Sequence, residues 1–315
     1  MPSRPCPRVS RGPRLISLAA ITLCAFLAAS CGSGSSPVSG SSGNTYDTIT
    51  PGALTVGVYQ DGMPYVGISG GKLTGLDGDL VNAAAAKLGM RINPVEVGSA
   101  FITSVQTRRV DLTVGDIGWR ADRAATGLFT DPPYYSPVAG AVRAGTQVTT
   151  LEDMARLQVG GLTGDFFVPG LQCLHVTLHG YQSDESALED LAAGRIGIFL
   201  HDALTLQSVK QAHPSLNFNV VYPAPPSSQA VKSCPGLADF QPFMTGWFVN
   251  KKESRLDSAL SQVIRGMYAA GTLSSVISKW GGNPGTMLVP QAYFTQQRVG
   301  VDRSAGWTAP SISRG

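Results

Sequence analysis

The chain has 315 residues, of which 43% are hydrophobic and 14% are charged, so it can bury a large core, and its length suits two compact lobes better than one. Its formal net charge is +3, but residues 1–30 contain four arginines and no acidic residue, which leaves residues 31–315 at −1. The basic character therefore belongs to the N-terminal segment, and no basic stripe remains that would indicate a nucleic-acid-binding protein.

The first 30 residues have the pattern of a signal peptide. The arginines precede an apolar run from Leu15 to Ala29, which is shorter than the roughly 20 residues needed to span a bilayer. The stretch LAASC at residues 27–31 resembles a bacterial lipobox, although Ala28 stands where leucine is preferred. We expect lipidation of Cys31 and a flexible tether over residues 31–49. The alternative is an ordinary signal peptide followed by an incidental cysteine.

After the tether, short apolar strands alternate with helical patterns. Residues 54–58, 92–97 and 110–114 predict strands, residues 67–75 a glycine-rich hairpin turn, and residues 79–88 a helix. Alternation of this kind builds an open parallel sheet with helices on both faces, so the expected fold class is α/β. In such sheets, ligands bind beyond the carboxyl ends of the strands.

The cysteines agree with export. Cys6 and Cys24 leave with the signal peptide and Cys31 would carry lipid, so Cys173 and Cys234 remain. We predict that these two form a disulfide within one lobe, as an oxidising compartment permits. Two free buried thiols are the alternative.

Two closing helices are predicted from their apolar faces, with Gly271 as a helix cap between them. Because these faces belong to the core, they supply no candidates for a binding site. Their residues are Leu256, Leu260, Val263, Ile264 and Met267 in the first helix and Leu273, Val276, Ile277 and Trp280 in the second.

Five stretches resemble, in order and spacing, family 3 of the bacterial extracellular solute-binding proteins. They are GLDGDLVNAAAAKLG (75–89), VQTRRVDLTVGDIGWRADR (105–123), LFTDPPYY (128–135), LAAGRIGIFLHDALTL (191–206) and LDSALSQVIRGMYAAGTLSSVISKWGG (256–282). The first stretch departs from the family pattern at Gly78, where an aliphatic residue is usual. The resemblance covers about residues 50–284 and implies the two-lobed periplasmic-binding-protein type II fold.

That fold implies two doubly wound sheets joined by two hinge strands, which we expect at residues 137–143 and 243–250. A ligand bound between the lobes would favour their closed arrangement. The expected domains are lobe 1 at residues 50–138 and 245–285, lobe 2 at 139–244, and a C-terminal extension at 286–315, to which we assign no function.

The resemblance assigns two charged ligand contacts. Arg123 lies 12 positions after Asp111, the family's spacing for the arginine that clamps a substrate carboxylate, and a planar guanidinium can bind both oxygens. The alternative is a surface pair with Asp122 or Asp131. Asp202 matches the acid that accepts hydrogen bonds from an α-amino group; it could also cap the next helix, and both roles can coexist.

Other positions depart from the amino-acid-binding pattern. Asp165 replaces a threonine of the lobe 2 turn, and Asp116 stands where serine or glycine is common. Acids together with aromatic rings favour an amine or quaternary ammonium, unless the acids neutralise Arg123 or the rings are core. The full set of expected ligand-binding residues is Arg123, Asp202, Asp116, Gly118, Trp119, Tyr65, Tyr59, Thr163, Asp165 and Phe166.

The resemblance therefore implies an exported lipoprotein on the outer face of the cell membrane that binds an amino acid or related amine and delivers it to an ABC permease. We expect a monomer without catalytic residues, cofactor or metal; His175 and His179 in a strand would lie roughly 13 Å apart, too far to chelate a metal ion. Two alternatives stay open. One is a cyclohexadienyl-dehydratase-like enzyme with Asp165 as general acid, and the other is a ligand-sensing accessory protein for a membrane receptor.

Overall fold

The computed structural model describes residues 44–58, 63–163, 165–291, 303–304 and 306–312. The expected signal peptide, Cys31 and Tyr59 lie outside the described residues. Residues 42–315 form one compact unit. Within the described ranges, no helix is both long enough and apolar enough to cross a lipid bilayer.

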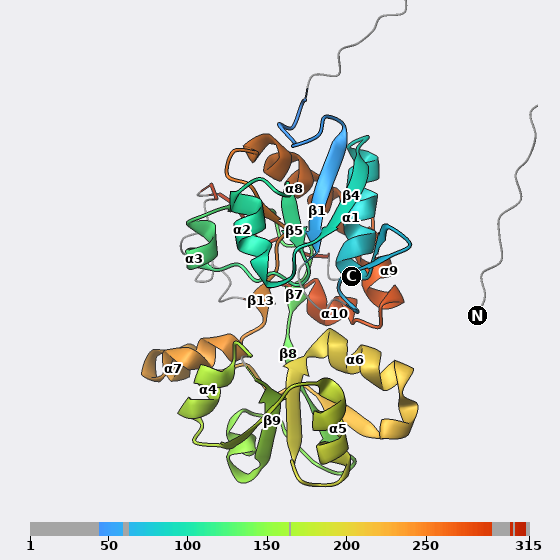
Figure 1. Cartoon of the computed structure of the whole chain (residues 1–315). Coiled ribbons are helices and arrows are strands. Elements are labelled where there is room, and N and C mark those ends of the chain that lie inside the picture. The colour runs from blue at the N-terminus through green and yellow to red at the C-terminus, as the bar shows by residue number, and fades with distance from the viewer. Residues whose placement is uncertain (1–43, 59–62, 164, 292–302, 305, 313–315) are drawn as a thin grey trace, which may run out of the picture. The chain divides into compact units, whose positions relative to one another are not determined.

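The first five-stranded sheet has the strand order β4-β1-β5-β14-β6 (Figure 1). β1 is parallel to β4 and β5, whereas β14 is antiparallel to both of its neighbours. The parallel strands end at one edge, where we expect ligands to bind. The strands are β1 (Ala53–Val58), β4 (Arg91–Glu96), β5 (Leu112–Val114), β6 (Leu128–Phe129) and β14 (Phe248–Val249).

The second five-stranded sheet has the order β10-β9-β11-β8-β12. β9 is parallel to β10 and β11, and β8 is antiparallel to β11 and β12. Each sheet thus has three parallel strands on one side followed by an antiparallel neighbour, and the expected α/β class is confirmed. The strands are β8 (Val138–Arg143), β9 (Gln158–Leu162), β10 (Thr177–Tyr181), β11 (Ile198–Asp202) and β12 (Phe218–Val221).

A short two-stranded sheet joins β7 (Tyr135–Ser136) to β13 (Phe243–Met244), where the chain leaves the first sheet and returns to it (Figure 1). The expected continuous strand 243–250 is interrupted between β13 and β14. Gly246 N donates to Ile117 O (2.9 Å) and Trp247 N to Thr130 Oγ1 (3.0 Å), so the backbone at this point bonds to loops of the first sheet. A hairpin of β2 (Gly67–Ser69) and β3 (Lys72–Thr74) forms the predicted glycine-rich turn.

Helices cover both sheets (Figure 1). The predicted core residues Leu256, Leu260, Met267 and Ile277 are fully buried. The helices are α1 (Leu76–Lys87), α2 (Phe101–Gln106), α3 (Ala121–Ala124), α4 (Val168–Cys173), α5 (Asp184–Ala192), α6 (Ala203–Ala212), α7 (Ser228–Ser233), α8 (Ser254–Ala269), α9 (Thr272–Lys279) and α10 (Pro284–Met287). The 3-10 helices are η1 (Gly98–Ala100), η2 (Glu152–Arg156), η3 (Pro214–Leu216) and η4 (Pro235–Phe240).

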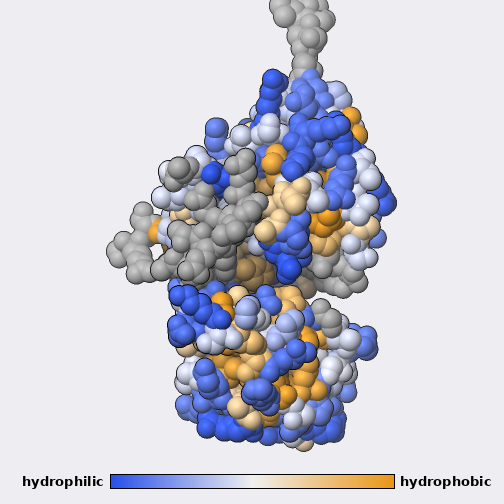
Figure 2. All heavy atoms as spheres, turned by 90° about the vertical axis from the view of Figure 1, so that its left-hand side faces the viewer, coloured by the Kyte–Doolittle hydropathy of each residue, from blue (hydrophilic) through white to orange (hydrophobic). Residues whose placement is uncertain are grey.

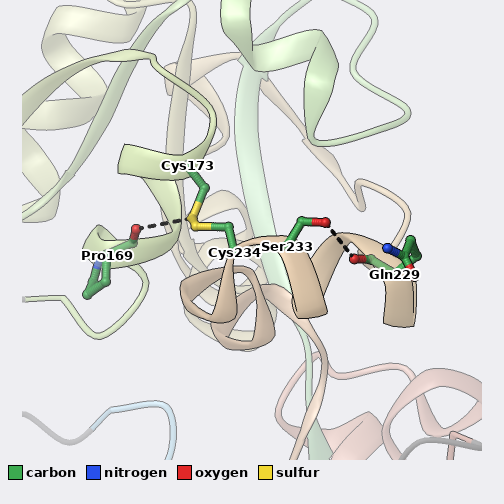
Figure 3. The surroundings of a disulfide bond; sticks show 5 residues. All are labelled: Pro169, Cys173, Gln229, Ser233 and Cys234. Atoms are coloured by element: carbon green, nitrogen blue, oxygen red, sulfur yellow. Dashed lines mark hydrogen bonds between the residues drawn. A yellow bond between two sulfur atoms is a disulfide. The ribbon is translucent and has the colours of Figure 1, made fainter.

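The predicted disulfide is present. Cys173 at the end of α4 is bonded to Cys234, which immediately precedes η4 (Figure 3). Their Cα atoms are 6.1 Å apart, within the ordinary range for a disulfide. The bond therefore joins two elements of the region that contains the second sheet. Figure 2 views the molecule from the left-hand side of Figure 1. In its lower half, hydrophobic residues lie among hydrophilic ones on the surface.

Candidate functional site

Asp116 lies just beyond the end of β5, at the edge where the parallel strands of the first sheet terminate. Its φ is 54°, a left-handed conformation that aspartate adopts more readily than most residues. Its Oδ2 accepts a hydrogen bond from Ser136 Oγ (3.0 Å). Its Oδ1 is buried and, among the described residues, has no hydrogen-bond partner. An unpaired buried carboxylate oxygen of this kind is available to a donor on a ligand.

Asp77 in the first turn of α1 fixes the backbone of Asp116. Its Oδ2 accepts hydrogen bonds from the backbone amides of Gly115 (3.1 Å) and Asp116 (3.0 Å). The same carboxylate accepts from Tyr134 Oη (2.9 Å) and Trp247 Nε1 (3.0 Å). Asp77 is 2% exposed, and both of its oxygens already accept hydrogen bonds. This acid therefore positions the site residues and does not itself contact a ligand.

Gly75 determines where Tyr65 lies. The backbone amides of Leu76 and Asp77 donate to Pro64 O (2.8 Å) and Tyr65 O (2.7 Å), which joins the start of α1 to the Tyr65 segment. Gly75 has φ 96°, and a Cβ there would lie 2.4 Å from Tyr65 O. Only glycine permits this approach, so the first motif of the sequence positions both Asp116 and Tyr65.

Asp202 ends β11 in the second sheet and begins α6. Its Oδ1 accepts from Thr205 N (2.8 Å), which is the N-cap bond of α6, and also from Tyr65 Oη (2.7 Å). Tyr65 Oη lies 3.4 Å from Ser136 Oγ, which in turn donates to Asp116. A chain of two acids and two hydroxyl groups therefore connects the strand ends of the two sheets.

His201 shares this site, although sequence reasoning did not select it. Its Nδ1 is 2.6 Å from Asp202 Oδ2 and its Nε2 is 3.5 Å from Asp184 Oδ1. Burial opposes protonation of the ring, but Asp202 and its hydrogen bond, followed by Asp184 and Asp165, raise the pKa of His201 to about 9. The imidazole is therefore charged at neutral pH.

The acids of the cluster respond differently to this environment. Burial, then the carboxylates of Asp202 and Asp77, raise the pKa of Asp116 well above its usual value. Burial also acts on Asp202, but His201 outweighs it and lowers the pKa of Asp202 to about 2. The pKa of Asp165 is raised by burial, which His201 partly offsets. Asp202 is thus the anion of the site, and Asp116 holds its proton more readily.

Arg123 lies on the short helix α3. Its Nη1 donates to Gly118 O (3.0 Å), and its guanidinium carbon lies 5.3 Å from the centre of the Phe101 ring. The carboxylate clamp expected for Arg123 stays a prediction. Gly118 is pressed against Phe243, because a Cβ at Gly118 would lie 3.0 Å from that ring.

The remaining predicted residues fall into two groups. Trp119 is 5% exposed, and its ring centre lies 5.4 Å from that of Trp307; the structure places it in the core and does not bring it together with Asp202. Thr163 is exposed and its Oγ1 accepts from Gln182. Phe166 is 41% exposed, 5.6 Å from Phe243 between ring centres.

Sequence reasoning missed Ser136, Asp184 and His201. The one available signal was His201 itself, a titratable residue immediately before the predicted ligand acid. Neighbours in a strand normally point to opposite faces, so a strand pattern does not place His201 beside the carboxylate of Asp202. Here the ring folds back onto Asp202 at the end of the strand.

The cluster is rich in acceptors and suits a cationic donor such as an ammonium group. In the described part of the chain, no group of three or more histidine, cysteine or acidic side chains is arranged to hold a metal ion. Asp202 carries the negative charge, Tyr65 and Ser136 supply hydroxyls, and the free oxygen of Asp116 completes the set.

A family model described as bacterial extracellular solute-binding proteins, family 3, matches residues 54–283. The chain is 27% identical over 154 residues to the probable ABC transporter extracellular-binding protein YckB of Bacillus subtilis, a match covering 47% of this chain and 54% of YckB. It is 25% identical over 170 residues to the probable amino-acid-binding protein YxeM of the same organism, covering 52% of this chain and 64% of YxeM. The matches thus span less than two thirds of either relative.

Solved structures share the fold. The L-cystine solute receptor of Neisseria gonorrhoeae, in its unliganded open conformation, has a TM-score of 0.60 and 20% identity, covering 73% of this chain and 93% of the receptor. An ancestral arginine-binding protein bound to arginine has a TM-score of 0.57 and 22% identity, covering 73% of this chain and 99% of that protein. At these identities the likeness establishes the fold, which is that of type II periplasmic amino-acid-binding proteins.

Proposed function

Because this chain belongs to family 3 of the bacterial extracellular solute-binding proteins, we propose that it captures a small amino-acid-type solute for an ABC importer. The solute carries an ammonium group and a carboxylate, and the two lobes expected from the sequence close over it. The similarity to an ABC transporter extracellular-binding protein and to an amino-acid-binding protein supports this class of solute.

The observation that carries this proposal is the link from Asp202 through Tyr65 and Ser136 to Asp116. An ammonium group has three donors. It would take the place of the Tyr65 hydroxyl on Asp202 and donate to the unpaired Oδ1 of Asp116. A solute that contacts acids from both sheets stabilises the arrangement in which they lie together.

We assign the carboxylate of the solute to Arg123. The support is that Arg123 follows Asp111 by 12 positions, the spacing found in the family. If the solute is instead a cation without a carboxylate, Arg123 contributes nothing or repels it. The charge of the solute can therefore be read from the response to Arg123→Ala.

The first experiment is native mass spectrometry of the protein purified from cells, which identifies a retained solute. Calorimetric titration then compares the wild type with Asp202→Asn, Asp116→Asn and Arg123→Ala, using amino acids, polyamines and betaines. We expect Asp202→Asn to weaken binding by about 2 kcal/mol or more, the scale for truncating one partner of a buried charge pair. Asp116→Asn should weaken it less, because the raised pKa of Asp116 keeps that acid protonated more readily. Glu189→Gln, which removes an exposed carboxylate from α5, is the matched control.

Three outcomes would change the proposal. Retained amino-acid affinity in Arg123→Ala contradicts the carboxylate clamp, and unchanged affinity in both Asp202→Asn and Asp116→Asn contradicts the ammonium site. Turnover of prephenate or arogenate would replace binding by catalysis.

We also propose that the protein is exported and lipidated at Cys31. Metabolic labelling with a fatty acid tests this, by comparing the wild type with Cys31→Ser.

A further inference from the structure

His201 is enclosed by carboxylates from three elements. Asp202 adjoins it on β11, Asp184 begins α5, and Asp165 lies in the turn between β9 and α4. The Nδ1–Oδ2 distance to Asp202 is 2.6 Å and the Nε2–Oδ1 distance to Asp184 is 3.5 Å. The side chains of His201 and Asp202 are 18% and 13% exposed. A protonated His201 therefore contacts the same Asp202 carboxylate that is assigned to the solute ammonium.

The Nδ1 atom of His201 has two neighbours that require opposite protonation states. Asp202 Oδ2 at 2.6 Å is an acceptor, which Nδ1 satisfies only when it carries a proton. The backbone N–H of Asp202 at 2.8 Å is a donor, which Nδ1 satisfies only when it has lost that proton. Protonation therefore decides whether the ring binds the carboxylate or the backbone of Asp202.

Both oxygens of the Asp202 carboxylate already have partners in the ligand-free structure. Oδ1 accepts from Thr205 N and Tyr65 Oη, and Oδ2 faces His201. A solute ammonium that reaches this carboxylate brings a second cation to an anion that already has one. The two cations repel each other, and His201 removes the repulsion when it releases a proton.

We propose that His201 is a resident cation of the solute site, and that a solute ammonium binding to Asp202 displaces its Nδ1 proton into the solvent. This inference rests on the proposed function and adds a specificity-determining residue to it. In the balanced step, protonated His201 and free solute ammonium become neutral His201, bound solute ammonium and one proton in the buffer. Neutral Nδ1 then accepts the backbone N–H of Asp202.

Proton release makes the affinity depend on pH in a fixed direction. By linkage, affinity for an ammonium solute rises with pH by at most about tenfold per unit for one released proton. The other titratable groups facing the ring are Asp202, Asp184 and Asp165, with Asp116 beyond Asp202. We therefore expect affinity to rise between pH 6 and pH 8 in the wild type.

The binding arm uses calorimetry at pH 7 in buffers of different ionisation enthalpy, with L-glutamine, L-arginine and putrescine as probes. In the wild type the observed heat should vary with the buffer and report up to one released proton. In His201→Gln this dependence should vanish, the pH profile should flatten, and affinity at pH 6 should rise. Equal proton release in wild type and His201→Gln, or none in the wild type, overturns the inference. Glu189→Gln should behave like the wild type.

A ligand-free arm separates this inference from the proposed function. Two-bond ¹H–¹⁵N NMR of the imidazole ring measures the pKa of His201 directly, and we expect it near 9 in the wild type and lower in Asp202→Asn. A pKa at or below 6.5 in the wild type overturns the resident cation whether or not any solute binds. If the ring titrates near 9 and none of the three probes binds, the assigned solute class is wrong and the resident cation stands.

Discussion

At the scale of single residues, Asp77 shows how one carboxylate can organise a binding site without contacting a ligand. It accepts hydrogen bonds from the backbone amides of Gly115 and Asp116. It also accepts from the Tyr134 hydroxyl and from the indole N–H of Trp247. These partners come from the turn after β5 and from two separate loops, so the carboxylate holds together segments that are far apart in the sequence.

We predict that Asp77→Asn destabilises the protein by about 1–3 kcal/mol, the cost of a buried donor without an acceptor. In either orientation of the amide, its NH₂ group faces a donor that Asp77 now satisfies. Urea unfolding measures the change. The control is Asp79→Asn, two residues further along α1. Asp79 is 24% exposed, and its Oδ2 accepts from the exposed Lys279 Nζ and from Trp280 Nε1. Its asparagine variant keeps an acceptor oxygen for one of these donors, so we expect a smaller loss than for Asp77→Asn. Equal costs for the two variants would contradict the role of Asp77.

Part of the site could be predicted at this scale and part could not. The motifs select Asp202 and Asp116, and Tyr65 is selected as an aromatic ring; the structure brings the three together through the Tyr65 hydroxyl and Ser136. The Tyr65–Asp202 bond nevertheless joins positions 137 residues apart, and no local pattern specifies such a contact. Trp119 is selected as an aromatic ring, but in the structure it is buried and packs on Trp307, which lies beyond the recognised motifs.

At the scale of elements, the hydrophobic patterns predicted strands and helices well and their ends less well. The helix expected at residues 79–88 begins at Leu76, because Gly75 with its positive φ forms the entrance and places Asp77 in the first turn. The strand expected at residues 243–250 is divided by side-chain and backbone bonds to other loops. Element ends depend on such tertiary partners, which periodicity does not report.

The disulfide yields a prediction for the α4 and η4 pair that it joins. Its sequence separation is 61 residues, and closing a loop of that length in the unfolded chain is worth about 4 kcal/mol in the chain-entropy model. The double variant Cys173→Ala, Cys234→Ala should therefore lose up to that free energy of unfolding while solute affinity stays within about twofold. Denaturant unfolding and calorimetry measure the two quantities. Alkylation of both thiols in denatured, unreduced wild type would show that the bond does not form.

At the scale of the whole molecule, the C-terminal segment described at residues 303–304 and 306–312 is part of the folded unit, although it lies outside the matched family region. Trp307 packs on Trp119, and its Nε1 donates to Asp131 Oδ1 (2.6 Å). Pro310 O accepts from Tyr135 Oη (2.5 Å), in the strand that also contains Ser136 of the site. The segment therefore supports the crossing between the two sheets, and sequence analysis had left it without a role.

Arg303 provides the last prediction. Its guanidinium is paired with the buried carboxylates of Asp131 and Asp257. Burial raises the pKa of Asp257 to about 7, and Arg303 opposes that rise. Because this folded pKa exceeds the usual aspartate value, the stability that Asp257 contributes is complete at low pH and is lost as pH rises through 7. Arg303 limits that loss, since it attracts only the ionised acid.

Arg303→Gln should therefore destabilise the protein by up to about 1.4 kcal/mol more at pH 8 than at pH 5, because Asp257 without its cation takes up a proton and pH 8 lies one unit above its pKa of about 7. The cost should be clearly smaller at pH 5, where Asp257 carries a proton and needs no counter-charge. Urea unfolding at the two pH values measures the difference, with Ser311→Ala, an exposed change in the same segment, as the control. A cost that is the same at both pH values would mean that Arg303 acts through Asp131 and through packing on Trp119, and leaves the ionisation of Asp257 unaffected.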